Sequence, residues 1–180
     1  MTYKIVFVCS GNRFRSPLAA AVLQRAAKTL PVEVLSVGTL DLEPGAALPG
    51  AVTAAARYGL DLGEHRSRPL RGADLSDLDL VVGFQRIHVA TAVVDGGAAR
   101  ERAFMLTELV QLLAGQELAG HGIERARSAV ASAARTRSTQ EVVVAAEIHD
   151  PIGRPRAVAD QIADEVRELT ERLATQLFGL

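Results

Sequence analysis

The single cysteine of this 180-residue chain stands in a segment whose residue types suit phosphate chemistry. Cys9 follows an apolar run, and Arg15 and Ser16 come shortly after it. A cysteine thiolate is a strong nucleophile, and the planar guanidinium of an arginine can hold two oxygens of a phosphate group at once. Where a strand leads into a helix, unpaired backbone N–H groups and the helix dipole also attract an anion. These residues predict attack of a thiolate on a phosphate group.

The residues that follow the cysteine suit a loop that wraps around an anion. Glycine adopts positive φ without strain and asparagine tolerates it better than most residues, so Gly11 and Asn12 are expected to turn the chain. Ser16 is expected to donate a hydrogen bond to the sulfur, and Pro17 to occupy the first position of a helix. A cysteine that only fills the core is the alternative, because free cysteines are often buried. The predicted phosphate-binding loop consists of Ser10, Gly11, Asn12, Arg13, Phe14, Arg15 and Ser16.

Alternating strands and helices are expected to hold this loop at one edge of a sheet. Apolar runs predict strands, and segments with helical spacing lie between and after them. Strands separated by helices indicate a parallel sheet, which binds ligands at the carboxyl ends of its strands. Thr107 is expected to cap the helix after the fourth strand. The expected strands are 3–9, 32–37, 78–82 and 103–106, and the expected helices are 17–29, 48–58, 85–94, 123–137 and 157–178.

Motifs in a consistent order over almost the whole chain resemble the low-molecular-weight protein tyrosine phosphatases. The first is Cys-x5-Arg-Ser-Pro directly after the first strand. The others are Ser36–Thr39, Leu60–Arg68, Leu78–Val82 followed by His88, and Asp150–Pro151. The resemblance implies one three-layer α/β/α domain over residues 1–180, with a four-stranded parallel sheet in the order 2-1-3-4. Residues 114–147 exceed what the family core requires, and we expect them to form a helical or loop insertion.

The resemblance also implies a phosphomonoesterase whose expected substrates are phosphotyrosine proteins or small phosphomonoesters. Cys9 would form a phosphocysteine, Arg15 would hold the phosphate oxygens, and Asp150 would act as general acid and then general base. No metal or other cofactor is implied. The side chains expected to support the loop are Asn12, Ser16 and His65. Three other histidines are expected to be structural or surface residues, namely His88, His121 and His149.

Three residues depart from the family pattern. Phe14 stands where many members carry a second cysteine that can protect the oxidised nucleophile as a disulfide. Arg13 stands where tyrosine-selective members carry an aliphatic residue and phosphoarginine-selective members a threonine. Its guanidinium is expected to repel phosphoarginine and could attract an acidic or doubly phosphorylated substrate. Ile152 replaces an aromatic residue that forms a wall against the substrate ring, so Phe14 or Phe84 would have to substitute for it.

Two other functions remain open from the residues alone. The first is a non-catalytic regulatory module that binds phosphate on the same fold. The second is an arsenate reductase, which would need an external small thiol because the chain has no cysteine besides Cys9.

Composition and charge indicate which partners and which cellular location to expect for the protein. A formal net charge of −1 gives no general attraction to nucleic acid or to an anionic membrane. No apolar run reaches the ~18 residues of a membrane span. These features predict a cytoplasmic protein that is a monomer or a weak homodimer. Arg135 and Arg137 in the expected insertion indicate either a solvated helix face or a basic rim that recruits an acidic substrate.

Overall fold

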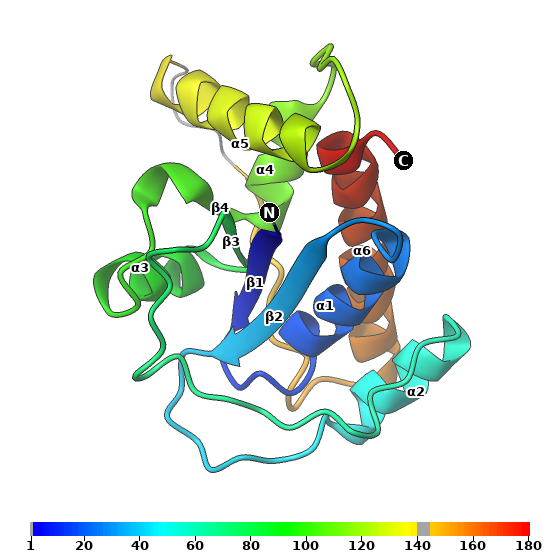
Figure 1. The fold of residues 1–180 in the computed structure, drawn as a ribbon. Helices are drawn as coiled ribbons and strands as arrows, with labels where there is room; N and C mark the ends of the chain where they lie inside the picture. Colours follow the sequence, from blue (N-terminus) through cyan, green and yellow to red (C-terminus); the bar gives the residue numbers. More distant parts are fainter. Residues whose placement is uncertain (1, 140–144) are drawn as a thin grey trace.

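A parallel sheet forms the middle of the protein (Figure 1). The computed structural model describes residues 2–139 and 145–180. Within these residues the sheet has four strands in the order β2-β1-β3-β4, which confirms the predicted order. The strands are β1 Tyr3–Cys9, β2 Val32–Gly38, β3 Leu80–Gly83 and β4 Ala103–Met105. The helices are α1 Arg15–Ala26, α2 Pro49–Arg57, α3 Arg86–Val94, α4 Leu106–Leu113, α5 Gly122–Thr139 and α6 Arg156–Phe178, with a 3₁₀ turn at Arg100–Arg102.

The central strand β1 is buried on both faces of the sheet. Ile5 and Phe7 point to a core shared with α1, α4, α5 and α6, whereas Val6 and Val8 point to the side covered by α3. This alternation follows from the two-residue repeat of a strand, and burial on both faces explains the continuous apolar run. Figure 1 shows α1 and α6 on one side of the sheet and α3 on the other, which gives the expected three layers.

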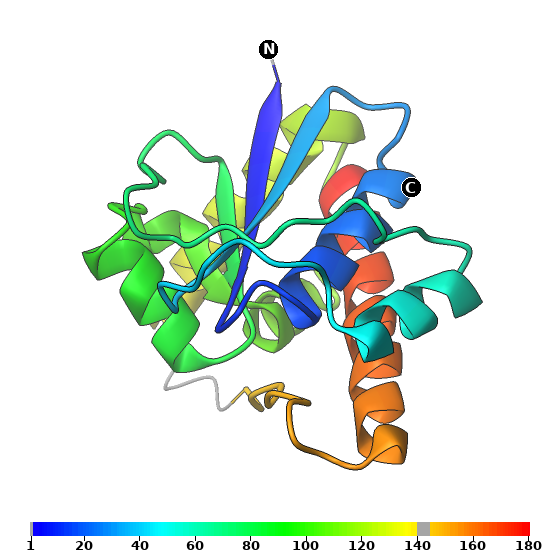
Figure 2. The same cartoon turned by 90° about the horizontal axis from the view of Figure 1, so that it is seen from below.

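All strands run in the same direction, so their carboxyl ends meet at one edge of the sheet. Figure 2 views this end and shows the loop after β1 together with the segment that leads into α6. The N–H of Ile148 donates to the carbonyl oxygen of Phe84 over 2.9 Å and attaches that segment to the end of β3. The topology therefore brings residues from the two ends of the chain to one site.

The starts of two helices differ from the residues that the sequence predicts. α1 begins at Arg15, so Pro17 occupies the third helical position, where the missing N–H still costs no helical bond. Thr107 does not cap α4, which begins one residue before it. Its hydroxyl donates to the carbonyl oxygen of Ala146 over 2.7 Å. The carboxylate of Glu108 instead accepts the N–H of Met105 at 3.1 Å, as in a capping box.

The last turn of α5 is anchored to the sheet by an arginine. The two terminal nitrogens of Arg137 donate to the carbonyl oxygens of Ala103 and Arg100 over 2.7 and 2.6 Å. The guanidinium carbon lies 4.0 Å from the centre of the Phe104 ring. Arg137 therefore holds a helix in place, and the basic-rim interpretation is wrong for this residue. Arg135 is exposed.

Candidate active site

The loop after β1 turns at Asn12. Its φ is 51°, and it is the one non-glycine residue of the described chain with positive φ. Gly11 does not adopt positive φ, so the expected division of the turn between the two residues was wrong. The loop lies directly on Gly38, where an added Cβ would lie 2.8 Å from the carbonyl oxygen of Ser10. A glycine is required at position 38 because the loop backbone approaches so closely.

A buried hydrogen-bond network surrounds the sulfur of Cys9. The sulfur lies 3.0 Å from the hydroxyl oxygen of Ser16. Asn12 donates from Nδ2 to the same oxygen over 2.9 Å. Because that donor occupies the oxygen, the Ser16 hydrogen is free to point at the sulfur. The side chains of Cys9, Asn12 and Ser16 are almost fully buried, and the network therefore lies in a medium that strengthens it.

Asn12 also ties the loop to two other segments. It donates from Nδ2 to the hydroxyl of Ser36 over 2.8 Å, and its Oδ1 accepts the N–H of Arg68 at 2.8 Å. Nε2 of His65 lies 2.7 Å from the Asn12 carbonyl oxygen, which is the place expected of a supporting residue. Partial burial is the main cause that lowers the pKa of His65, although its bond to the Asn12 backbone opposes this.

The guanidinium of Arg15 joins the loop to the distant Asp150 segment. Its side chain is 1% exposed. Nη2 donates to Oδ2 of Asp150 over 2.5 Å and to the hydroxyl of Ser10 over 3.2 Å. Nη1 donates to the carbonyl oxygen of Ile148 over 2.8 Å and to Oε1 of Gln85 over 3.0 Å. These four bonds and the nearby carboxylate compensate for burying the charge of Arg15.

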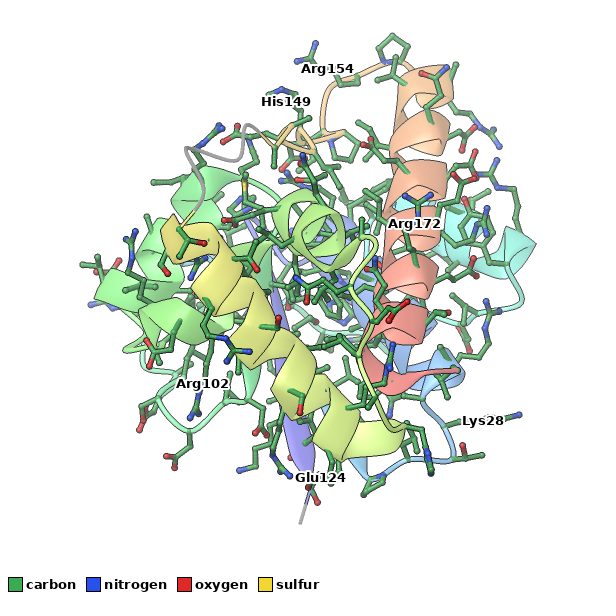
Figure 3. All side chains as sticks on the ribbon, turned by 90° about the horizontal axis from the view of Figure 1, so that it is seen from above. Lys28, Arg102, Glu124, His149, Arg154 and Arg172 are labelled. Carbon is green, nitrogen blue, oxygen red and sulfur yellow. The ribbon has the colours of Figure 1, made fainter. Side chains whose placement is uncertain are left out.

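The segment before α6 presents Asp150 to the loop, while His149 and Arg154 lie on the outside of the protein. Oδ1 of Asp150 accepts the N–H of Ile152 at 3.0 Å, which leaves the other oxygen for Arg15. Figure 3 labels His149 and Arg154 at the edge of the molecule, and both residues are exposed. The adjacency of His149 to Asp150 in sequence therefore does not place its ring in the site.

His88 is a member of the site that the sequence analysis did not include. The residue is 0% exposed, and Nε2 lies 3.1 Å from the hydroxyl oxygen of Ser10. Its position in the third residue of a helix that follows a buried strand was the available signal. Burial, followed by the charge of Arg15, lowers the pKa of His88 to about 4, although Asp150 and Glu147 act in the opposite direction.

Neither of the expected substitute aromatic residues forms a wall at the site. Phe14 is 5% exposed and packs in the core, and Phe84 lies beneath Arg15, with the guanidinium carbon 5.9 Å from its ring centre. Two exposed aliphatic side chains lie in segments near the site instead, Ile152 two residues after Asp150 and Leu42 beside Gly11. Ile152 is 60% exposed, and Leu42, 40% exposed, lies 3.7 Å from where a Cβ on Gly11 would be.

Arg13 folds onto a neighbouring loop. Nη2 donates to the carbonyl oxygen of Glu43 over 2.8 Å, and Nε donates to the hydroxyl of Ser67 over 3.4 Å. A Cβ on Gly45 would lie 2.5 Å from Nη2, so a larger residue at position 45 would displace the Arg13 guanidinium. The guanidinium thus attaches residues 43–45 beside the loop after β1.

The parts of the chain outside the site add two observations. Within residues 2–139 and 145–180, no group of three or more histidine, cysteine or acidic side chains has an arrangement that could hold a metal ion. None of the helices in the described part of the chain combines the length and the apolarity needed to cross a lipid bilayer.

Known proteins share both this sequence pattern and this fold. The family model described as low molecular weight phosphotyrosine protein phosphatase matches residues 4–120. A protein-arginine-phosphatase of Bacillus subtilis (strain 168) is 30% identical over 96% of this chain and 95% of its own length. A probable low molecular weight protein-tyrosine-phosphatase, EpsP, of Ralstonia solanacearum is 41% identical over 46% of this chain and 55% of its own. The crystal structure of a YwlE mutant from Bacillus subtilis superposes with a TM-score of 0.72 at 29% identity, covering 98% of this chain and 99% of that one.

The fold and the loop after β1 define a class of cysteine-dependent phosphatases. The chain belongs to the low molecular weight phosphotyrosine protein phosphatase family. It is a hydrolase that acts as a phosphatase, and the resemblance stated from the sequence is confirmed.

Proposed function

We propose that the protein hydrolyses phosphotyrosine in protein substrates through a phosphocysteine formed on Cys9. The thiolate attacks phosphorus in line, and the bond from phosphorus to the leaving oxygen breaks. Asp150 delivers a proton to that oxygen, so the phenol leaves neutral. Asp150 then takes a proton from the water that attacks the phosphocysteine, and the bond from phosphorus to sulfur breaks, which releases phosphate and restores the Cys9 thiolate.

In this mechanism the loop after β1 and the side chain of Arg15 bind the phosphate oxygens. Backbone N–H groups of residues 10–15 and the guanidinium fork stabilise the charge that shifts onto these oxygens in the transition state. Ser16 donates to the sulfur and keeps it as a thiolate, while Asn12 and His65 hold the loop. The observation that carries this proposal is the 2.5 Å contact between Arg15 and Asp150, because it joins a phosphate ligand to an acid from the far end of the chain.

The choice of phosphotyrosine as the substrate is supported by the side chains at the edge of the site. Leu42 and Ile152 are exposed aliphatic residues, and a flat apolar phenol ring can pack between such side chains.

We also propose that the enzyme works in the cytoplasm as a monomer or weak homodimer. In that compartment its one free thiol would stay reduced. Sedimentation velocity that finds a stable larger assembly would contradict the oligomeric part.

The test compares two substrates in wild type, Cys9→Ser, Asp150→Asn and the control His149→Gln. Cys9→Ser is expected to abolish hydrolysis of p-nitrophenyl phosphate and of a phosphotyrosine peptide. Asp150→Asn is expected to lower kcat by about 10²–10⁴-fold for phosphotyrosine, as is usual for loss of a general acid. The loss is expected to be smaller for p-nitrophenyl phosphate, because its leaving group needs a proton less. His149→Gln is expected to retain activity.

Two results would contradict the proposal. Equal losses on both substrates in Asp150→Asn would remove Asp150 from the role of general acid. A folded wild type that binds phosphate but hydrolyses neither substrate would indicate a phosphate-binding module.

Phosphoarginine is the second candidate substrate, and the observation that favours it is the full-length similarity to a protein named protein-arginine-phosphatase. Peptides of one sequence that carry either phosphotyrosine or phosphoarginine decide between the two. A preference of more than about tenfold in kcat/KM, equal to about 1.4 kcal/mol in the transition state, is expected for phosphotyrosine. The opposite preference would replace the proposed substrate.

A further inference from the structure

The ring of His88 is fixed in one tautomer by the backbone around it. Nδ1 faces the N–H groups of Phe84 and Gln85, at 3.3 and 3.1 Å. Two donors point at this nitrogen, so it cannot carry a hydrogen itself. In a neutral imidazole the other nitrogen then carries the hydrogen, and Nε2 donates to the hydroxyl oxygen of Ser10 over 3.1 Å.

The ring remains neutral under ordinary assay conditions. The charged groups that face it are Arg15, Asp150 and Glu147, and the lowering effects of burial and Arg15 exceed the raising effects of the two carboxylates. The pKa of His88 is about 4, well below neutral pH. The donor on Nε2 is therefore a permanent feature of the folded site.

The hydroxyl of Ser10 receives two donors and has one hydrogen left. Its oxygen accepts the Nε2 hydrogen of His88 and the Nη2 hydrogen of Arg15, at 3.1 and 3.2 Å. A hydroxyl has two lone pairs and one hydrogen, so both lone pairs are occupied and the hydrogen must find a further acceptor. The same Arg15 nitrogen donates to Asp150, so the Ser10 hydroxyl and the Asp150 carboxylate bind one nitrogen of the guanidinium.

We propose that Ser10 donates its hydroxyl hydrogen to an oxygen of the bound phosphate group, and that His88 is the positioning residue that aims it. The inference rests on the proposed function, because the phosphate is the group that Arg15 holds. It adds a side-chain donor to a loop that otherwise offers backbone N–H groups and one guanidinium. His88 orients Ser10 without touching substrate.

The test measures binding of inorganic phosphate by calorimetry and kcat/KM for p-nitrophenyl phosphate, always with Cys9 intact. Ser10→Ala is expected to weaken phosphate binding about tenfold or more, the usual loss for a hydrogen bond to a charged group. Ser10→Thr keeps the hydroxyl and is expected to bind within about twofold of wild type. His121→Asn, a change at an exposed histidine, controls for the loss of an imidazole.

His88→Asn distinguishes two roles of His88. One is to orient the Ser10 hydroxyl, and the other is to accept backbone N–H groups at the start of α3. The amide oxygen of asparagine can accept the backbone N–H groups that Nδ1 accepts, but the side chain is too short to reach Ser10. The single change is expected to weaken phosphate binding toward the level of Ser10→Ala. The double change is expected to be no worse than Ser10→Ala alone, because both remove the same donor.

Two outcomes would overturn the inference. One is phosphate binding in Ser10→Ala that stays within about twofold of wild type, and the other is full additivity of the two changes. If His88→Asn does not fold, the pair Ser10→Ala and Ser10→Thr still decides. Binding of phosphate does not depend on turnover, so a wild type without hydrolysis would contradict the proposed function while leaving this comparison intact.

Discussion

At the scale of single residues, a buried neutral histidine links this site to the stability of the fold. His88 is neutral when folded, with a pKa of about 4 against the ordinary value of 6.5. Below pH 6.5 the unfolded chain therefore binds a proton that the folded protein does not. Stability from this group is complete above pH 6.5 and falls as the pH drops toward 4.

The first prediction is that His88→Asn reduces the acid sensitivity of the protein. Between pH 7 and pH 4 the wild type is expected to lose on the order of 2–3 kcal/mol of unfolding free energy through His88. Urea unfolding at a series of pH values measures this loss in wild type and variant. His65 also has a lowered pKa, so some acid sensitivity is expected to remain. Parallel pH profiles for the two proteins would show that His88 does not titrate in this way.

The candidate catalytic residues could be named before the structure, but some of the side chains that contact them could not. Cys9 and Arg15 stand out by type and spacing because few other side chains attack or bind phosphate, whereas Asp150 is a candidate through the family resemblance. Asn12 rather than Gly11 takes the positive φ, and this depends on how the loop fits over its neighbours. The contact of His88 with the loop arises from burial between a strand and a helix that are distant in sequence from the cysteine. Sequence spacing carries no such information.

At the scale of elements, α5 is held by inward contacts of its arginines. Its buried face is mostly alanine, with Ala126, Ala129 and Ala133 beside Val130, and the small side chains allow close packing. Arg137 adds two bonds to backbone carbonyls and a contact with the ring of Phe104. Burial lowers the pKa of Arg137, although Glu108 counteracts this. The last turn of α5 is therefore fixed to β4 and the turn before it.

The second prediction separates the two arginines that the sequence analysis grouped together. Arg137→Gln is expected to lower the free energy of unfolding by about 1–3 kcal/mol, because two carbonyl oxygens lose a charged donor and the ring loses its cation. Arg135→Gln, the matched control on the exposed side, is expected to change it by less than about 0.5 kcal/mol. Chemical denaturation measures both values. Equal effects of the two changes would contradict the anchoring role.

Hydrophobic periodicity predicted the order and type of the elements, while their ends depended on tertiary contacts. The expected strand at 78–82 begins at Leu80 instead. Asp79, just before it, contacts Lys4 on the neighbouring strand, since its carboxylate accepts the N–H of Lys4 at 2.9 Å. Thr107 is drawn away from the start of α4 by a carbonyl from the segment before Asp150. In both places a partner far along the chain decides the local structure, and a short sequence window cannot contain it.

At the scale of the whole molecule, the site is assembled only when the chain is folded. The cysteine loop follows the first strand, and Asp150 reaches it from the segment before the last helix. Arg15 connects the two segments, because it donates hydrogen bonds to the side chain of Asp150 and to the backbone carbonyl of Ile148. A ligand that binds Arg15 therefore binds the folded state alone, and ligand binding must raise the stability of the entire protein.

The third prediction is a thermal shift with inorganic phosphate. At a phosphate concentration of about 100 times Kd the unfolding free energy is expected to rise by about 2.7 kcal/mol. For a chain of this size that corresponds to an increase in Tm of roughly 5–10 °C. Arg15→Lys keeps a charge but loses the planar fork, and it is expected to remove most of the shift. Asp150→Asn is expected to keep or enlarge the shift, because the carboxylate competes with phosphate for the same guanidinium nitrogen. Scanning calorimetry of the three proteins with and without phosphate measures these shifts, and an undiminished shift in Arg15→Lys would place the phosphate elsewhere on the molecule.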